Sequence, residues 1–432
     1  MNKNKEKKYF NDFFSKRKFT FENNFNYIGT GCEHSYYCTS KDLYFFGSNK
    51  YNQLGNTRYI DKTINKKSIL RTFSDFGIDS ILKISTGGYH TLILLKNKKT
   101  YSFGKNLYGQ CAQEFDSNVN LEKIKIFDND IKYYGKIDIT NIKCGLNHTI
   151  ILTSDGRILT FGLNEFGQLG NVGITFTYRP TYIDVTNIQD IYTSNSSNSN
   201  FIVTNENNIF AFGENQLGHL GVNKETNIFT PTPVIFDNKV KIKYITNNSL
   251  NTFIINAYND VYAIGIFKYN ESGLLKKKKI NVFTKVFLKN SEKNIEIKKI
   301  VNDGRGFIIN LFDNFQVWGV GFNEIGQLGI GNTLKQKTLK NIEFFNDKKI
   351  IDICCGVGHS LALSENGDIY GWGFNKCRQL GINSENKILP IKIGNINISK
   401  CINYFFNNLY KILLIKDKKN KKFKFDIHII FC

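Results

Sequence analysis

Residues 161–170 read Phe-Gly-Leu-Asn-Glu-Phe-Gly-Gln-Leu-Gly, and this pattern returns along the chain in seven copies, one of them worn. Its general form is aromatic-Gly-x-Asn-x-x-Gly-Gln-Leu-Gly. A fixed period of this kind is the sequence signature of a repeat architecture. The copies lie 51–58 residues apart, counted from their first glycines, which are Gly47, Gly104, Gly162, Gly213, Gly265, Gly321 and Gly373.

The ten-residue pattern has a simple physical interpretation. Two or three glycines within eight residues indicate a tight turn after a strand, because glycine adopts a positive φ without a steric penalty. A leucine supplies one apolar side chain per loop. In six copies an asparagine stands two places after the first glycine, where its side chain can bind the backbone of its own loop. We interpret these residues as structural; the asparagines are Asn49, Asn106, Asn164, Asn215, Asn323 and Asn375.

A second signature, Gly-x-x-His-Ser/Thr, lies upstream of four copies. The residues between the two signatures predict a β-hairpin, with type I′ turns at Asp155-Gly156 and Asn366-Gly367. The strands are apolar on both faces, so we expect each repeat to be a small antiparallel sheet with a neighbour on either side. Seven such sheets predict an all-β fold, a single seven-bladed β-propeller. The histidines of this signature are His34, His90, His148 and His359.

Neither the histidines nor the cysteines predict a chemical active site. Besides the four repeat histidines, His219 replaces a repeat glutamine and His428 lies in the tail, so none remains as a lone general base. We expect each repeat imidazole to bind backbone through a ring nitrogen. The nine cysteines contain no C-x-x-C pair, and no phosphate-binding glycine loop is present. The sequence therefore predicts no catalytic residue, no metal and no cofactor, and it assigns His90, His148 and His359 to the scaffold.

Repeats four, five and six depart from the pattern. In repeat four, Ser199 takes the histidine slot inside the polar run Ser194–Asn200, which we expect to loosen that strand. Repeat five has Asn251 in the same slot and loses most of the ten-residue pattern. Repeat six has Phe307 there.

The combined motifs resemble the regulator of chromosome condensation repeat family over residues 27–400. The resemblance implies a seven-bladed propeller whose two chain ends share one blade. We therefore expect a flexible basic lead at residues 1–18 and one propeller domain at residues 19–432. Half a further repeat is expected to complete a blade beside residues 18–27; it comprises residues 391–393, 398–401, 410–415 and 423–430.

The net charge of +21 permits an acidic partner, such as chromatin, another nucleic acid or an acidic protein face. The positive residues are scattered, and solvated loops and tails are the alternative interpretation. No apolar run approaches the length of a membrane span, and the first residues lack a hydrophobic signal core. We expect an intracellular protein of the cytoplasm or nucleus. The densest basic runs are residues 3–8, 16–18, 276–279 and 416–424.

The resemblance implies three classes of function. The first is a guanine-nucleotide exchange factor for a small GTPase of the Ran type. The second is a non-catalytic scaffold that binds other proteins. The third, light sensing, depends on clustered tryptophans, and we dismiss it because Trp318 and Trp372 are the only tryptophans and do not follow that pattern.

Exchange factors of this family use a projecting, wedge-like loop, and the worn loop of repeat five is similar in character. That branch of the family, however, carries its wedge in repeat three and an aspartate just before the repeat histidine, where this chain has Tyr89 and Asn147. The scaffold therefore stays open as the alternative. The partner contacts predicted for the loop are Lys268, Tyr269, Asn270 and Glu271.

Overall fold

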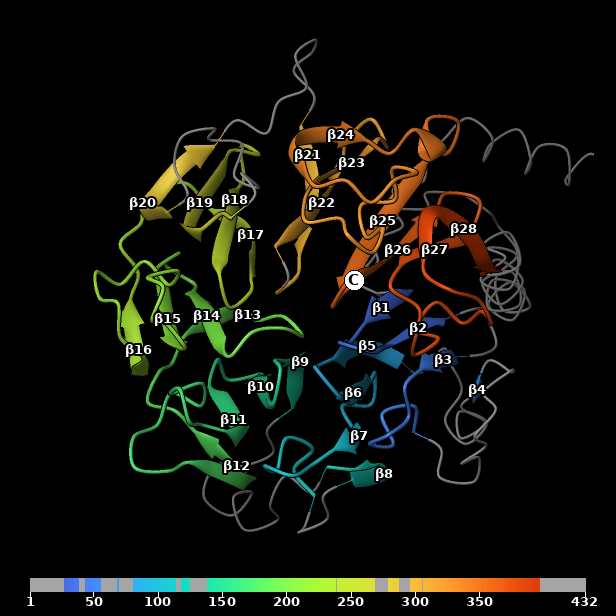
Figure 1. Cartoon of the computed structure of the whole chain (residues 1–432). Helices are drawn as coiled ribbons and strands as arrows, with labels where there is room; N and C mark the ends of the chain where they lie inside the picture. Colours follow the sequence, from blue (N-terminus) through green and yellow to red (C-terminus); the bar gives the residue numbers. More distant parts are fainter. Residues whose placement is uncertain are drawn as a thin grey trace, which may run out of the picture.

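Seven four-stranded antiparallel sheets surround a common axis in the computed structural model (Figure 1). Each sheet, or blade, contains four strands that are consecutive in the sequence, with the first strand nearest the axis and the fourth at the rim. The predicted seven-bladed propeller is therefore confirmed. The structure describes residues 27–38, 43–55, 68–69, 81–113, 118–124, 138–237, 239–268, 279–286, 296–304 and 306–396.

The strands follow the repeats in order. Blade one contains β1 (Ile28–Thr30), β2 (His34–Cys38), β3 (Leu43–Gly47) and β4 (Ser68–Ile69), and blade two contains β5 (Ile81–Thr86), β6 (His90–Leu95), β7 (Thr100–Lys105) and β8 (Asn118–Lys123). Blade three contains β9 (Ile139–Cys144), β10 (His148–Thr153), β11 (Ile158–Leu163) and β12 (Phe176–Tyr182), and blade four contains β13 (Ile188–Tyr192), β14 (Ser199–Thr204), β15 (Ile209–Gly213) and β16 (Ile228–Pro233).

The second half of the ring has the same order. Blade five contains β17 (Ile242–Asn247), β18 (Asn251–Asn256), β19 (Val261–Ile266) and β20 (Lys279–Val286). Blade six contains β21 (Ile297–Asn302), β22 (Phe307–Phe312), β23 (Val317–Gly321) and β24 (Gln336–Asn341). A short 3-10 helix, η3 (Glu343–Phe345), leads to blade seven, which contains β25 (Ile350–Gly356), β26 (His359–Ser364), β27 (Asp368–Gly373) and β28 (Lys387–Asn395).

The core lies between neighbouring blades. Every residue of the second strands β6, β10, β14, β18, β22 and β26 is buried, as expected for strands covered on both faces. Aromatic side chains pack across the gaps: Phe45 of blade one and Phe103 of blade two meet edge to face at 5.3 Å. Because burying one such ring contributes about 1.5–3 kcal/mol, contacts between blades carry much of the stability of the ring.

The hairpins that join second and third strands differ from the prediction. A type I′ turn requires a positive φ at both central residues, but Asp155 has none and Gly156, at +75°, does. The Thr153 amide donates to Arg157 O at 3.0 Å, and the Gly156 amide donates to Thr153 O at 3.1 Å. The turn is therefore a three-residue loop that ends in a left-handed glycine, and the type I′ assignment is wrong.

Blades seven and one meet directly and close the ring. Phe46 of blade one covers Gly381 of blade seven so closely that a Cβ on this glycine would lie 3.2 Å from the ring, and Tyr37 covers Gly394 in the same way at 2.9 Å. Residues 391–393 belong to β28 and complete blade seven. Their assignment to a further half repeat is therefore wrong.

The basic lead at residues 1–18 and the strands expected beyond residue 397 lie outside the described residues, so a blade shared by the chain ends stays a proposal. It predicts that removal of residues 401–432 lowers the melting temperature, because a sheet edge would lose its partner. Calorimetry of the full chain and of residues 1–400 measures this effect. An unchanged, single transition would mean that the contacts between blades one and seven close the ring by themselves.

Candidate functional site

The connections of each blade emerge at two opposite ends of the ring. Because neighbouring strands are antiparallel, the connection from the first to the second strand and that from the third to the fourth strand lie at the same end. The first of these carries the Gly-x-x-His motif and the second carries the Gly-Gln-Leu-Gly pattern. We call this end the loop face, and the opposite end, with the hairpin turns, the hairpin face.

Asparagine and glutamine side chains fix the loops between third and fourth strands. In blade three, Asn164 Oδ1 accepts from the Leu169 amide at 2.8 Å, while its Nδ2 donates to Asn171 O at 2.7 Å. Gln168 Oε1 accepts from the Phe166 amide at 2.8 Å. The predicted role of the asparagine is confirmed, and it recurs at Asn49, Asn106, Asn215, Asn323 and Asn375.

The glycines of both motifs make room for the repeat histidine. A Cβ on Gly145 would lie 2.0 Å from Cε1 of His148, so the imidazole rests on a residue without a side chain. Gly162 pairs with His148 across the strands and has a φ of +109°, and a Cβ there would lie 2.6 Å from Asn147 O. The structural glycines predicted from the sequence share this positive φ, between +91° and +115°: Gly47, Gly104, Gly162, Gly213, Gly321 and Gly373.

The repeat histidines join neighbouring blades. His148 Nε2 lies 2.9 Å from Oδ1 of Asn200 in blade four, and His90 Nε2 lies 3.0 Å from Oγ1 of Thr149 in blade three. His359 of blade seven and Ser35 of blade one repeat this contact at 2.8 Å. The sequence predicted a bond to backbone and missed this side-chain contact: the ring lies across the gap, and Nε2 reaches the residue next to the histidine slot of the following blade.

The hydrogen-bond partners of these rings determine which ring nitrogen carries the proton. The Thr149 hydroxyl donates to Gln110 O at 2.8 Å, so it can only accept from His90 Nε2. Asn200 donates to Gln168 O through Nδ2 and accepts from His148 through Oδ1. Each of these two imidazoles therefore carries a proton on Nε2. Burial lowers the pKa of His90 to about 3 and that of His148 to about 4, so neither is suited to acid–base chemistry near neutral pH.

Blade four exchanges two residues of the pattern. Ser199 occupies the histidine slot, and His219 occupies the glutamine slot with its Nε2 3.2 Å from Ser199 Oγ. The imidazole therefore stays within its own blade. The gap to blade five is bridged by Asn247, whose Nδ2 donates to Ser197 Oγ at 2.8 Å.

The connection between β13 and β14, residues 193–198, extends from blade four towards the axis of the ring (Figure 1). We call it the axial loop. Asn195 Nδ2 donates to Thr30 O of blade one at 2.6 Å and to Cys355 O of blade seven at 3.2 Å. The Leu146 amide of blade three donates to Ser197 O at 2.9 Å. The sequence predicted that the polar run would loosen β14, and this prediction is wrong: the strand is buried and paired on both sides, and groups of the run bind blades on the far side of the ring.

The contacts predicted for the worn loop are only partly described. Lys268 is exposed and follows the buried Phe267, which packs on Phe253 at 5.6 Å just after β19. Tyr269, Asn270 and Glu271 lie outside the described residues. This part of the site therefore stays a prediction.

A group of aromatic and basic side chains, which the sequence did not single out, lies on the loop face of blades one and two. Nζ of Lys105 lies 5.3–5.8 Å from the ring centroids of Tyr51, Tyr89 and Tyr108. Tyr51 and Tyr89 meet edge to face at 5.3 Å, and Lys50 lies 5.2 Å from the Tyr51 ring. We call these five residues the tyrosine–lysine cluster.

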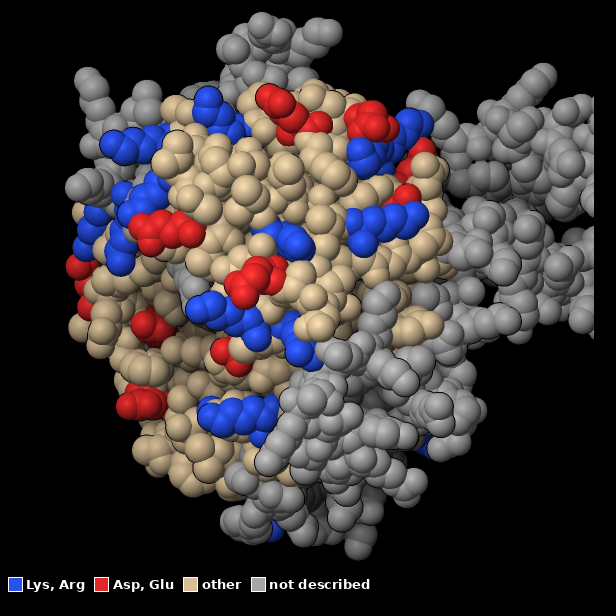
Figure 2. All heavy atoms as spheres, turned by 45° about the vertical axis from the view of Figure 1, so that its right-hand side comes forward, with Lys and Arg blue, Asp and Glu red and all other residues tan. Residues whose placement is uncertain are grey.

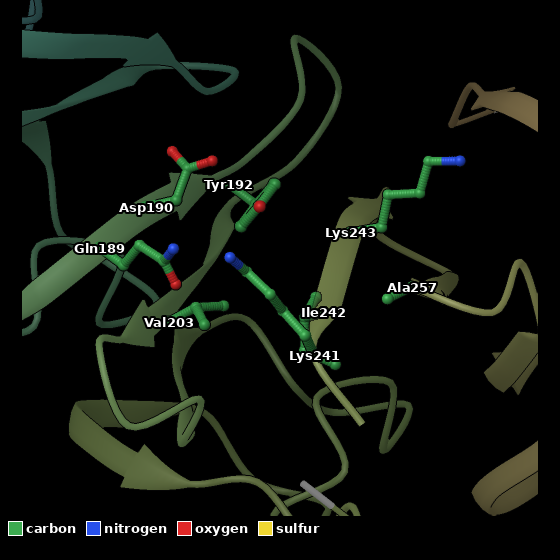
Figure 3. Close-up of a pocket in the computed structure, with 8 residues that line it drawn as sticks. All are labelled: Gln189, Asp190, Tyr192, Val203, Lys241, Ile242, Lys243 and Ala257. Atoms are coloured by element: carbon green, nitrogen blue, oxygen red, sulfur yellow. The ribbon is translucent and has the colours of Figure 1, made fainter. Parts of the chain in front are cut away.

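The hairpin face carries two shallow clefts. The larger, about 490 Å³, lies between blades four and five, and the amino group of Lys241 points towards Gln189 and Tyr192 there (Figure 3). The other, about 410 Å³, contains the Asp155-Gly156 turn. No group of three or more histidine, cysteine, aspartate or glutamate side chains in the described part of the chain could hold a metal ion. Within the same part, no helix is long and apolar enough to cross a membrane.

Charge is mixed on the face shown in Figure 2, where lysines and arginines alternate with acidic side chains. Several ion pairs join such side chains in the described part of the chain, among them Lys299 with Asp352 at 2.7 Å and Lys392 with Asp368 at 2.5 Å. The view shows no large basic field, in agreement with the scattered charges of the sequence.

Two models of the regulator of chromosome condensation (RCC1) repeat match this chain. One matches residues 81–110, 139–168 and 350–379, and the other matches residues 206–246 and 316–363. These ranges include strands of blades two to seven.

Curated relatives align with most of the propeller. The ultraviolet-B receptor UVR8 of Arabidopsis thaliana is 24% identical over 82% of this chain and 78% of its own length. The X-linked retinitis pigmentosa GTPase regulator of Canis lupus familiaris is 26% identical over 72% of this chain, and the regulator of chromosome condensation of Drosophila melanogaster is 26% identical over 74%. This chain spans 30% and 59% of these two proteins, respectively, which is less than two thirds of either.

Among solved structures, Prp20p of Saccharomyces cerevisiae aligns with a TM-score of 0.69 at 18% identity, over 84% of this chain and 88% of that one. That structure was described together with the binding of Prp20p to Gsp1p and histones. At this identity, the likeness shows a shared propeller fold.

The buried histidines make stability depend on pH. The unfolded chain takes up protons on histidine below about pH 6.5, whereas burial holds the folded pKa of His148 at about 4. The stabilisation that the buried, neutral His148 contributes is therefore complete above pH 6.5 and is lost as the pH falls towards 4. Urea titrations at several pH values should show this fall in the free energy of unfolding. His148→Gln should reduce the slope of the unfolding free energy against pH by about 1.4 kcal/mol per pH unit. An unchanged slope would mean that His148 is protonated in the folded protein.

The axial loop should stabilise the whole ring. Asn195→Ala removes the amide that joins the carbonyls of Thr30 in blade one and Cys355 in blade seven, so we expect a loss of about 1–3 kcal/mol in the free energy of unfolding. Asn205→Ala is the matched control, because Asn205 is exposed and bonds only at the surface; it should change stability by less than about 0.5 kcal/mol. Equal effects in urea titrations would contradict a bridging role for Asn195.

Proposed function

The chain belongs to the regulator of chromosome condensation repeat family, and we propose that it is a binding protein whose loop face engages a small GTPase of the Ran type and promotes release of its guanine nucleotide. Such a regulator needs no chemical active site. It acts by stabilising the nucleotide-free form of its partner better than the loaded form. The proposal places the protein in the cytoplasm or nucleus, where such a partner would be found.

The observation that carries this proposal is that most loops of the loop face are held by structural hydrogen bonds, whereas one loop lacks the residues that form them. Most loops are fixed by the asparagine and glutamine bonds described above, and the buried histidines are neutral. The loop that follows Lys268 abandons this pattern. A loop that loses most of the pattern, in a rigid ring whose other loops keep most of it, favours a contact with a partner over further scaffolding.

The class of partner follows from relatives. One relative is named a GTPase regulator, and Prp20p was described as binding Gsp1p and histones. For this chain we propose that Lys268, Tyr269, Asn270 and Glu271 contact the GTPase near its nucleotide. The lysines at residues 276–279 would add long-range attraction to the anionic nucleotide, which salt would weaken.

A second candidate, a scaffold without exchange activity, is favoured by the residues before the repeat histidine. The exchange branch has an aspartate there, but this chain has Tyr89, which packs on Tyr51, and Asn147, which accepts from Lys105 at 3.3 Å. The worn loop also lies in blade five instead of blade three. Light sensing is not supported, because Trp372 is fully buried, donates to Gln327 O at 2.9 Å and serves the packing of blades six and seven.

Release of a fluorescent guanine nucleotide from a Ran-type GTPase tests the proposal. We expect the unmodified protein to accelerate release and the replacement of residues 268–278 by a Gly/Ser linker to reduce this acceleration about tenfold or more, because the loop supplies both contact and charge. Lys268→Glu should act in the same direction. Lys243→Glu, an exposed lysine on the hairpin face, is the matched control and should have no effect.

No acceleration by the unmodified protein, together with stable binding of the GTPase, would support the scaffold instead. Equal acceleration with and without the loop would keep exchange but remove Lys268–Glu271 from the contact. Binding and release are therefore measured on the same samples.

A further inference from the structure

The tyrosine–lysine cluster presents hydrogen-bond donors of which only Lys105, bonded to Asn147, has an acceptor within the described residues. Neither Lys50 nor Lys105 forms an ion pair with a residue that the structure describes. The phenol groups of Tyr51, Tyr89 and Tyr108 make no hydrogen bond within the same set of residues, and all three rings are half-buried. Five donor groups thus converge on one part of the loop face, with their side chains already held in place.

The backbone beneath the cluster is fixed before any partner arrives. The Tyr51 amide donates to Gln53 Oε1 at 2.8 Å, and the Tyr108 amide donates to Gln110 Oε1 at 3.0 Å. Lys105 is anchored by its bond to Asn147 Oδ1 at 3.3 Å. Half-buried tyrosines on a rigid support lose little entropy on binding, and they are typical of the residues that dominate protein interfaces.

The hydroxyl of Tyr89 remains a donor at physiological pH. Burial and the nearby Cys32 and Glu33 raise its pKa well above the usual value. Glu33 is the one carboxylate among these influences, and the cluster has two ammonium groups, so the net charge there is positive.

We propose that this cluster binds an acidic segment of a partner protein, with carboxylates placed between Lys50 and Lys105 and hydrogen-bonded by the tyrosine hydroxyls. Ammonium and phenol donors around one acceptor form charge-assisted hydrogen bonds, which are stronger than those between neutral groups. The surface is separate from the proposed GTPase loop, since it lies on blades one and two and that loop follows β19 of blade five (Figure 1). The inference does not depend on exchange activity.

Ring geometry favours an acidic protein segment over a single-stranded nucleic acid. Bases bind by stacking on free aromatic faces. Here Tyr51 and Tyr89 pack edge to face at an interplanar angle of 72°, and the ammonium of Lys105 lies over all three rings. The rings are therefore already engaged with Lys105, and two of them with each other, whereas their hydroxyl groups are left for an acceptor.

Fluorescence anisotropy with a labelled decaglutamate peptide tests the proposal on the full chain. We expect saturable binding that weakens at high ionic strength. Lys105→Gln should weaken it about tenfold, the effect of losing one charge-assisted contact. Tyr89→Phe, which keeps the ring but removes the hydroxyl, should weaken it by a smaller factor. Lys224→Gln, an exposed lysine on the loop face of blade four, is the matched control and should leave Kd unchanged.

Melting temperatures of the variants show that each is folded. Three results would overturn the proposal: no binding of decaglutamate by the unmodified protein, equal Kd values for Lys105→Gln and Lys224→Gln, or tighter binding of a labelled decathymidine that displaces the peptide. The last result would identify the cluster as a nucleic-acid surface. Loss of peptide binding in folded Lys105→Gln, with nucleotide release from the GTPase unchanged, would support two separate contacts.

Discussion

The ring depends on one hydrogen bond that crosses the gap between neighbouring blades, from a buried imidazole to the residue beside the next histidine slot. The other features of the repeat follow from it. The imidazole can reach across the gap only if the residue beneath it has no side chain, which explains Gly145. Its strand partner Gly162 has a positive φ and lies so close to Asn147 O that a Cβ would not fit. A pattern that looks like a turn motif in the sequence is therefore a packing requirement of the blade interface.

Where this bond is missing, a different contact bridges the same gap. Between blades four and five the amide of Asn247 replaces it, and between blades five and six Asn302 donates to Asn251 at 3.2 Å. Between blades six and seven, the indole of Trp372 donates to Gln327 O. A blade can thus lose its histidine without opening the ring, because any donor of suitable reach meets the need of the buried acceptor. Replacement of motif residues in a repeat is consequently weak evidence that the blade has lost its structure.

The sequence predicted what is local and periodic, and it missed what depends on the closed ring. The spacing of the glycines predicted seven blades, and the asparagine slots predicted the loop bonds, because both express contacts within a few residues. The sequence shows the axial loop only as a longer connection. Ser194 lies five residues before Ser199, whereas in blade three Gly145 lies three residues before His148. Its partners Thr30 and Cys355 are 165 and 160 residues from Asn195. The tyrosine–lysine cluster likewise joins side chains of two repeats, which no single motif contains.

A ring built in this way directs function to its loops. The buried His90 and His148 are neutral and already bound, and what varies from blade to blade is what the loops display. The axial loop touches several blades at once, so it ties together the parts of the loop face that carry the proposed GTPase contact and the proposed acidic-segment contact. Two partners bound there would be held at a distance fixed by the ring and not by a flexible linker. A rigid support of this kind suits a protein that acts by holding other proteins in one arrangement.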